Sequence, residues 1–208
     1  MLTPIVIDEV HPSTPLGLAA KAVAGAHVAV SAQVVADGHD RLGARVRWRR
    51  VGDRRWDHGP MQERGDGRWV GSFVPRDVGA FEVVVEAWTD RYATWCHEIE
   101  VKAEAGQPVE LELEEGAQIL DDLAGKVAKD AKARLREAAA AVRRPGCTVA
   151  VRIAAATHPD VRRLVAGVPD ARRSASARHP LWVDRPIAAH AAWYELFPRS
   201  FDGFQGAA

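Results

Sequence analysis

The spacing of apolar residues changes near Gly116, and this change limits the possible folds more than any other feature. Upstream of Gly116 apolar residues alternate with polar ones, whereas over residues 117–144 they recur every three or four positions. A period of two is typical of a strand with one dry face, and a period near 3.6 of an amphipathic helix. The sequence therefore predicts a β-domain over residues 1–115, followed by helices.

Six stretches of this first part are predicted to be strands. In residues 44–49 apolar side chains alternate with arginines, and in residues 109–114 they alternate with glutamates. The other four stretches show the same alternation and cover residues 28–34, 69–73, 81–87 and 95–101. Turn sequences such as Asp37-Gly38 separate them. Short alternating strands with no helices between them predict an antiparallel β-sandwich of immunoglobulin-like type.

The second part is predicted to be α-helical. An apolar stripe runs through residues 117–144 and ends at Pro145-Gly146, which indicates one long helix. Pro159 suits a first helical turn, so residues 159–166 are predicted to form a second, short helix. Residues 147–156 fit a strand and a helix equally well.

The C-terminal part returns to strand-like sequence. Residues 181–184 are predicted to form one strand and residues 192–197 another. If the first of these strands rejoins the sandwich, residues 116–178 form a helical insertion within the β-domain, and residues 179–208 begin with the return strand. The expected fold class is therefore mainly β, an immunoglobulin-like sandwich with an α-helical insert.

Charge and composition restrict the partners and the compartment. The chain has 28 Lys and Arg against 28 Asp and Glu, which argues against nucleic acid or an anionic membrane as a partner. The net charge of zero hides two regions of opposite charge, because residues 104–122 hold seven acids and no base, and residues 126–178 hold thirteen bases and four acids. The chain has neither a signal-peptide pattern nor an apolar run long enough to span a bilayer. We expect a cytoplasmic protein.

The sequence lacks motifs that are typical of phosphate-binding, metal-binding or nucleophilic sites. It contains no glycine-rich phosphate loop, no His or Cys pair with metal-ligand spacing, and no Gly-x-Ser-x-Gly motif. We therefore predict no catalytic residue, no metal ligand and no cofactor. His97 is predicted to be a buried, hydrogen-bonded histidine on a strand face, and Cys96 to be structural. Glu110, Glu112 and Glu114 are interpreted as a solvated strand face rather than as a glycosidase carboxylate pair.

The tryptophans are the remaining candidates for a site. Trp48 continues an apolar strand face and is predicted to lie in the core. Trp88 lies between Glu86 and Asp90, so we expect it to be partly exposed; a core position, a protein interface and a sugar contact all stay open for it. Trp95 is expected at the start of a strand. Trp88 and Trp95 are the two candidate substrate-binding residues.

Two C-terminal motifs carry a resemblance to a known family. Residues 180–185 read PLWVDR and residues 192–200 read AWYELFPRS. They resemble the junction of the bacterial maltose-1-phosphate maltosyltransferases, which belong to the α-amylase superfamily (glycoside hydrolase family 13). In that family a VDRE-type strand end leads into a WYELFPRS segment that begins the catalytic barrel. Residues 5–10 (IVIDEV), 37–40 (DGHD) and 86–90 (EAWTD) resemble the same family's N-terminal domain in order and spacing.

The resemblance implies a fold and an activity. It implies an N-terminal β-sandwich with a helical insertion, at a dimer interface and next to a (β/α)8 barrel. The family transfers maltosyl units from α-maltose 1-phosphate to the non-reducing end of an α-1,4-glucan, with retention. Its catalytic Asp and Glu lie in the barrel, so the resemblance assigns no catalytic residue here, and we expect this chain to be inactive alone. The implied partners are a second copy and the barrel, with α-1,4-glucan as a candidate ligand.

The sequence departs from the family pattern in two places. Pro186 stands where the family has the Glu of VDRE, and residues 201–208 end the chain where a barrel is expected to continue. We therefore expect the truncated front part of a longer enzyme that acts as a dimerisation and scaffold region. Two alternatives remain: a non-catalytic glucan-binding module that uses an exposed tryptophan, and an inactive truncated product.

Overall fold

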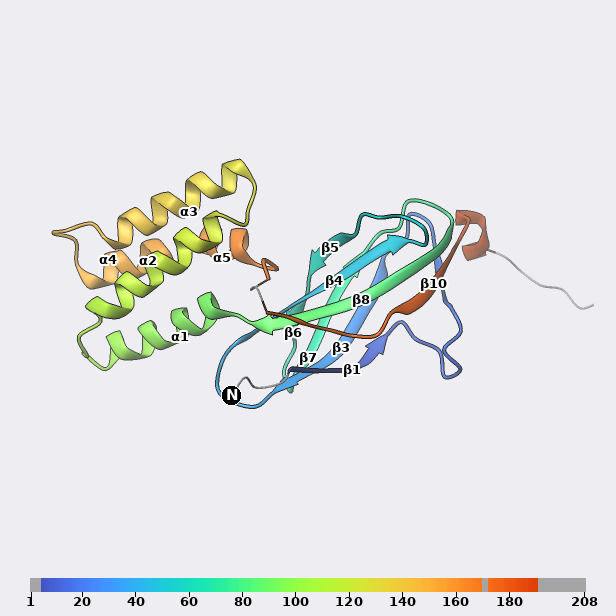
Figure 1. The fold of residues 1–208 in the computed structure, drawn as a ribbon, viewed down its shortest axis with the longest axis horizontal. Coiled ribbons are helices and arrows are strands. Elements are labelled where there is room, and N and C mark those ends of the chain that lie inside the picture. The colour runs from blue at the N-terminus through green and yellow to red at the C-terminus, as the bar shows by residue number, and fades with distance from the viewer. Residues whose placement is uncertain (1–4, 170–171, 191–208) are drawn as a thin grey trace, which may run out of the picture.

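A computed structural model describes residues 5–169 and 172–190 of the chain. A β-sandwich and a bundle of α-helices lie side by side (Figure 1). The strands are β1 (Ile5–His11), β2 (Ala20–Val23), β3 (Val28–Ala36), β4 (Leu42–Arg50), β5 (Asp57–Pro60), β6 (Gln62–Glu63), β7 (Arg68–Phe73), β8 (Gly79–Thr89), β9 (Ser174–Ala175) and β10 (His179–Asp184). The helices are α1 (Arg91–Glu104), α2 (Glu110–Ala124), α3 (Lys129–Val142), α4 (Val149–Ala156), α5 (Pro159–Val165) and the 3₁₀-helix η1 (Pro186–His190).

The strands form two sheets. The first has the order β1-β3-β7-β6, and the second has the order β2-β10-β8-β4-β5, with β9 paired to β8. The predicted mainly-β sandwich with helices is therefore confirmed. One pair departs from the expected antiparallel pattern, because β10 runs parallel to β2.

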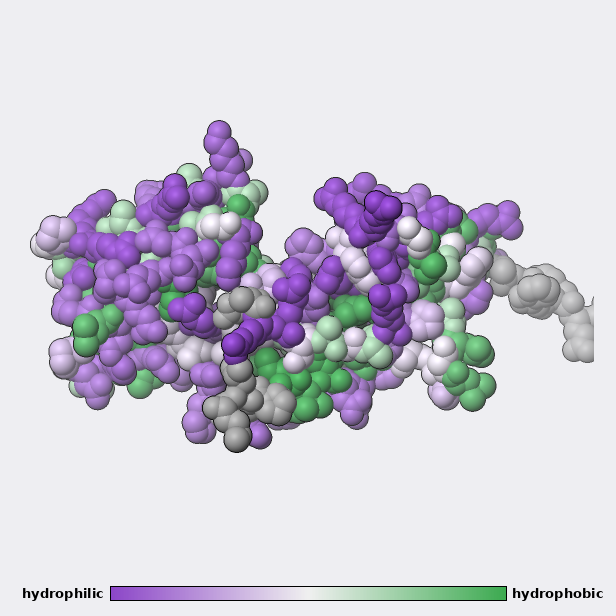
Figure 2. Space-filling model, in the orientation of Figure 1, coloured by the Kyte–Doolittle hydropathy of each residue, from purple (hydrophilic) through white to green (hydrophobic). Residues whose placement is uncertain are grey.

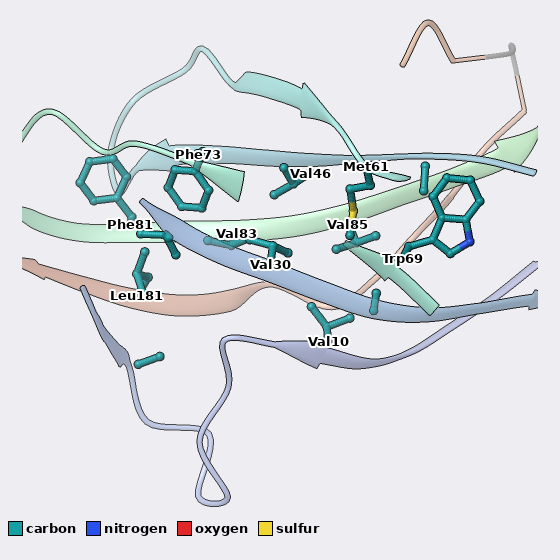
Figure 3. Packing of buried hydrophobic residues seen from close by; sticks show 14 of the residues in the cluster. Val10, Val30, Val46, Met61, Trp69, Phe73, Phe81, Val83, Val85 and Leu181 are labelled. Carbon is teal, nitrogen blue, oxygen red and sulfur yellow. The ribbon is translucent and has the colours of Figure 1, made fainter. Parts of the chain in front are cut away.

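The inner faces of the two sheets make the sandwich core. Val30, Val46, Val83 and Val85, from β3, β4 and β8, are at most 1% exposed and lie close together (Figure 3). Burying a side chain of this size stabilises a fold by about 1.5–3 kcal/mol. The alternation that identified these strands is the alternation between this core and the outer faces.

The helices are an insertion between two neighbouring strands. β8 leads into α1, and the chain returns through β9, which pairs with the end of β8 at Ala87↔Ser174. β10 then pairs with the start of β8, at Leu181↔Phe81. The return of residues 181–184 to the sandwich is thereby confirmed. The predicted strand over residues 192–197 lies outside the described residues.

The predictions for residues 95–101 and 109–114 were wrong. Both stretches are helical, in α1 and α2, so the change of secondary structure comes at Asp90 rather than at Gly116. Trp95 and Ile99 do alternate with polar residues, but Tyr92, Trp95, Cys96 and Ile99 also form the buried stripe of a helix. His97, expected to be buried, lies on the exposed side of α1.

The single helix predicted over residues 117–144 is two helices. α2 ends at Ala124 and α3 begins at Lys129, so the chain turns and α3 packs back on α2. Leu113, Leu120, Leu135 and Val142 meet in a second core, separate from that of the sandwich. The ambiguous residues 147–156 contain α4, and the predicted short helix is α5, with Pro159 at its start.

None of the helices in the described part of the chain is long and apolar enough to cross a membrane.

Candidate functional site

Trp88 lies on the outer face of the second sheet, beneath the helical insert. Its side chain is only 2% exposed, so the expectation that it is partly exposed was wrong. The ring fits against Gly43 on β4, where a Cβ atom would lie 2.7 Å from the indole. Beside it is a small cavity of about 30 Å³, to which Tyr92, Ile119 and Val165 of the insert also contribute. The buried ring offers no face to a sugar.

Trp95 is buried in the same way, within the insert. It is 3% exposed, and its Nε1–H donates a hydrogen bond to the carbonyl oxygen of Glu112 at 2.6 Å. Its ring packs on Gly116 of α2, where a Cβ atom would overlap it. Trp95 therefore joins α1 to α2, as Trp88 joins the sandwich to the insert. Both candidate residues make internal contacts.

A buried carboxylate lies at the centre of the outer face of the second sheet. Glu86 is 3% exposed and forms ion pairs with Arg45 at 2.7 Å, Arg47 at 2.6 Å and Arg173 at 3.2 Å. Burial by itself would raise the pKa of Glu86, but the hydrogen bonds from Arg45 and Arg47 outweigh it and hold this pKa below its usual value. A carboxylate held in its charged form by arginines does not serve as a general acid.

A second ion-pair group follows along the same strand. Glu82 pairs with Arg49 at 2.7 Å and with Arg178 at 3.2 Å, and the hydrogen bond from Arg49 lowers the pKa of Glu82. Arg173 and Arg178 belong to the segment that returns from the insert. We call Glu82 and Glu86, together with their five arginines, the arginine clasp. It fastens the returning chain to β8.

Cys96 is buried between α1 and its neighbours. Burial raises the pKa of its thiol to about 11, so the sulfur is protonated at neutral pH. Burial also raises the pKa of the adjacent Tyr92, whose hydroxyl donates to the carbonyl oxygen of Ala156 at 2.7 Å. This pair ties α1 to α4 and does not have the character of a nucleophile and its base.

No group of three or more His, Cys, Asp or Glu side chains among the described residues could hold a metal ion.

Two other tryptophans are more exposed than the predicted candidates. Trp182, on β10, is 40% exposed, and its Nε1–H donates to Asp184 at 2.8 Å. Trp56 is half-buried, with the guanidinium groups of Arg47 and Arg49 at 4.9 Å and 4.5 Å from its ring centroid. The exposure of Trp182 was predictable from the sequence, because Trp182 alternates with the apolar residues Leu181 and Val183 in a strand. The sequence contains no such signal for Trp56, which lies in a loop.

Comparison with known proteins gives a consistent picture. The model of the family described as "Alpha-1,4-glucan:maltose-1-phosphate maltosyltransferase, domain N/S" matches residues 3–185. The α-1,4-glucan:maltose-1-phosphate maltosyltransferase of Myxococcus xanthus (strain DK1622) is 36% identical over 212 residues, which cover 94% of this chain and 31% of the relative. The Pseudomonas aeruginosa protein of the same name is 36% identical over 203 residues, covering 96% of this chain and 30% of the relative.

A relative from Streptomyces coelicolor, α-1,4-glucan:maltose-1-phosphate maltosyltransferase 1, is 38% identical over 186 residues, which cover 87% of this chain and 27% of that protein. The chain thus spans about 30% of the length of the curated relatives it matches. The match of the family model ends at residue 185, just after β10, so it contains the described sandwich and insert together.

Proposed function

Since the chain belongs to the α-1,4-glucan:maltose-1-phosphate maltosyltransferase family, we propose that it is the scaffold region of a cytoplasmic enzyme that extends α-1,4-glucan from maltose 1-phosphate. The family match over residues 3–185 carries this proposal. In the proposed enzyme, catalysis takes place outside the described residues, in a barrel that the sandwich and the insert support.

The internal contacts of the chain support a structural role. The residues most suited to catalysis or ligand binding are not available for it. Trp88 and Trp95 are buried, Glu86 is paired with arginines, and Cys96 is protonated. A region whose polar and aromatic groups serve its own packing suits a rigid support better than a catalytic centre.

A chimera tests the scaffold role directly. Residues 3–185 of this chain would replace the matching part of the Myxococcus xanthus relative, and phosphate release from α-maltose 1-phosphate would be followed with glycogen as acceptor. We expect the chimera to be active and the same relative without this region to be inactive. The matched control carries Val46→Asp, which places a charge in the sandwich core and should abolish folding and activity together. A chimera that folds, by circular dichroism and gel filtration, and yet releases no phosphate would contradict the proposal.

The isolated chain supplies the complementary experiment. With α-maltose 1-phosphate and glycogen it should transfer no maltosyl units, because the proposal places the catalytic groups elsewhere. Measurable transfer by the 208-residue chain would refute that part of the proposal.

We further propose that the chain forms a homodimer, as the family resemblance implies. Exposed apolar side chains such as Leu16 and Leu111, 82% and 85% exposed, are compatible with association. Light scattering coupled to gel filtration should give twice the 22.6 kDa mass of the chain. A strict monomer at high protein concentration would refute the dimer and leave the scaffold role untouched.

A further inference from the structure

A groove lies between the sandwich and the helical insert. Its volume is about 730 Å³, within the roughly 300–1,000 Å³ range of small-molecule sites, which often lie where two parts of a protein meet. One wall comes from β4 and β5, and the other comes from the α2–α3 turn, the start of α3 and the end of α5. Figure 2 shows that the surface is hollowed between the two parts on the face in view.

The groove residues of the sandwich all lie on the outer face of the second sheet. Arg45 is next to Val46, which is buried in the sandwich core, so the side chain of Arg45 is on the outer side. Pro60 lies opposite Arg45 in the ladder, and His58 lies opposite Arg47, so both share this outer side. The insert covers the same side, and the two walls therefore face each other.

A close contact joins the two walls. Gly167, which follows α5, lies against Pro60 of β5, and a Cβ atom on Gly167 would be 3.3 Å from the Pro60 side chain. Gly167 also has a φ of +76°, a conformation that suits glycine. The arginine clasp holds the returning chain to β8 nearby. The groove is therefore formed before a ligand binds, and a ligand loses little free energy in shaping it.

The wall that comes from the insert is apolar apart from Lys126. Val127 and Leu164 are half-buried and pack against the core of the insert, so this wall is the outer side of a packed core. The other residues of the wall are small or apolar: Ala128, Ala131, Ala166, Gly167, Val168 and Pro169. Such a surface binds the hydrocarbon part of a ligand, because the contact removes apolar surface from water.

The polar side chains of the groove all carry nitrogen atoms. They are Arg45, His58 and Lys126, and no carboxylate is among the described residues that line the groove. Arg45 donates to Glu86 through Nε at 2.8 Å and contacts it through Nη2 at 2.7 Å, which leaves Nη1 for a ligand. Together with a ring N–H of His58 this gives two donors, which match the two oxygens of a carboxylate.

The environment of His58 agrees with a preference for negative charge. Burial lowers the pKa of His58, and the charges of Arg45 and Arg47 lower it further. The opposing charges of Asp57 and Glu86 do not reverse this shift. Since Glu86 is paired with three arginines, positive charge is in excess on this side of the groove. An arrangement that disfavours a further positive charge favours a negative one.

We propose that this groove binds a small amphipathic carboxylate, with its charged group at Arg45 and His58 and its apolar chain along Val127 and Leu164. A neutral hydrocarbon would leave the nitrogen donors without an acceptor, and a cation would be repelled by Arg45. Such a ligand contacts the sandwich and the insert together, so its binding stabilises their arrangement. This inference does not depend on the proposed function.

Titration of the isotope-labelled 208-residue chain with octanoate, followed by amide NMR spectra, tests the proposal. We expect saturable shifts that centre on Val127, Ala131 and Gly167. Acetate lacks the apolar chain and octylammonium reverses the charge, so each should bind at least about tenfold more weakly than octanoate.

Three variants locate the site. His58→Glu places a carboxylate beside Arg45 and should weaken octanoate binding by about tenfold or more, whereas His58→Lys should keep or increase the affinity. Ala131→Trp, at a half-buried position of the apolar wall, should fill the groove and abolish binding. The matched control is His97→Glu, which introduces the same charge at an exposed histidine outside the groove and should leave the affinity unchanged.

Several outcomes would overturn the inference. Absence of saturable binding to the folded wild-type chain would reject the site, and shifts that centre outside the groove would place binding elsewhere. Octylammonium bound as tightly as octanoate would reject the selection for an anion. Because the amide spectrum also reports folding, wild-type affinity in a folded His58→Glu or a folded Ala131→Trp variant would refute the location, and either variant suffices if the other does not fold.

Discussion

At the scale of single residues, Glu86 shows how one carboxylate holds two distant parts of the chain together. Its arginine partners come from β4 and from the returning segment at Arg173. Because its pKa is lowered on folding, the charged form stabilises the fold. This contribution is fully present above the unfolded pKa, for which the usual value is 4.5, and is lost as the pH falls through the lower pKa of the folded state.

Glu86→Gln tests this role. The substitution should lower the free energy of unfolding at pH 7 by about 3 kcal/mol, because Arg45 and Arg47 lose their shared partner in a largely buried place. It should also flatten the loss of stability between neutral pH and pH values below 4.5. Urea unfolding at several pH values measures both effects. The control is Glu63→Gln, at an exposed glutamate of β6, which should change neither; an unchanged pH profile in Glu86→Gln would refute the role.

Gly43 is a second residue whose identity is dictated by its neighbour. A Cβ atom there would lie 2.7 Å from the Trp88 indole, so Gly43→Ala must displace a ring that is buried. We expect a loss of about 1–3 kcal/mol in the free energy of unfolding, measured by urea titration. Gly59→Ala is the matched control, because its new methyl group would lie at an ordinary 3.6 Å from Trp48. Equal stabilities of the two variants would show that Trp88 can move.

At the scale of elements, the sequence predicted the strands with a single buried face and missed the first two helices. β3, β4 and β7 have apolar alternation that matches one dry face, and so does the first half of β8, whose second half is buried on both faces. In α1 a strand-like alternation and a helical stripe overlap, and short windows do not separate them. In α2 the glutamates of the first turn alternate with apolar residues, although Leu111 is in fact 85% exposed.

The burial of the candidate tryptophans could not be predicted for a related reason. Whether Trp88 is exposed depends on the insert that covers it, and the position of the insert is set by contacts between distant residues. The alternation of residues within a strand indicates which face of the strand is apolar, but it does not indicate which other element covers the opposite face.

The start of α1 offers a prediction about an element. Asp90 caps this helix by accepting a hydrogen bond from the backbone N–H of Ala93 at 2.9 Å, at the point where β8 passes into the insert. Asp90→Ala should destabilise α1 by about 1 kcal/mol and increase amide hydrogen exchange in its first turn. Asp90→Asn keeps the accepting oxygen and should behave like the wild type; exchange that is unchanged in Asp90→Ala would contradict the capping role.

At the scale of the whole molecule, two separate cores are joined by Trp88, Tyr92 and the arginine clasp. Figure 2 shows a mainly hydrophilic surface over the helical part on the face in view and a mixed surface, with hydrophobic patches, over the sandwich. Because the insert leaves and rejoins the sandwich at neighbouring strands, its removal does not require any strand to change register.

A shortened chain tests this independence. Replacing residues 90–172 with a Gly-Asn-Gly turn should leave a folded sandwich by circular dichroism, with tryptophan fluorescence shifted to longer wavelength because Trp88 becomes exposed. Since that exposed ring could cause aggregation, the same deletion with Trp88→Lys serves as the second variant. Loss of cooperative unfolding in both shortened chains would show that the sandwich depends on the insert.

The position of β10 between β2 and β8 has a consequence for biosynthesis. While the ribosome is still adding residues 91–178, β2 and β8 are complete but lack the strand that joins them, whereas the helical bundle is built from contiguous residues and can form from local contacts. The insert can therefore fold on the nascent chain before the sandwich closes. The sandwich becomes complete only when Asp184, the last residue of β10, has left the exit tunnel.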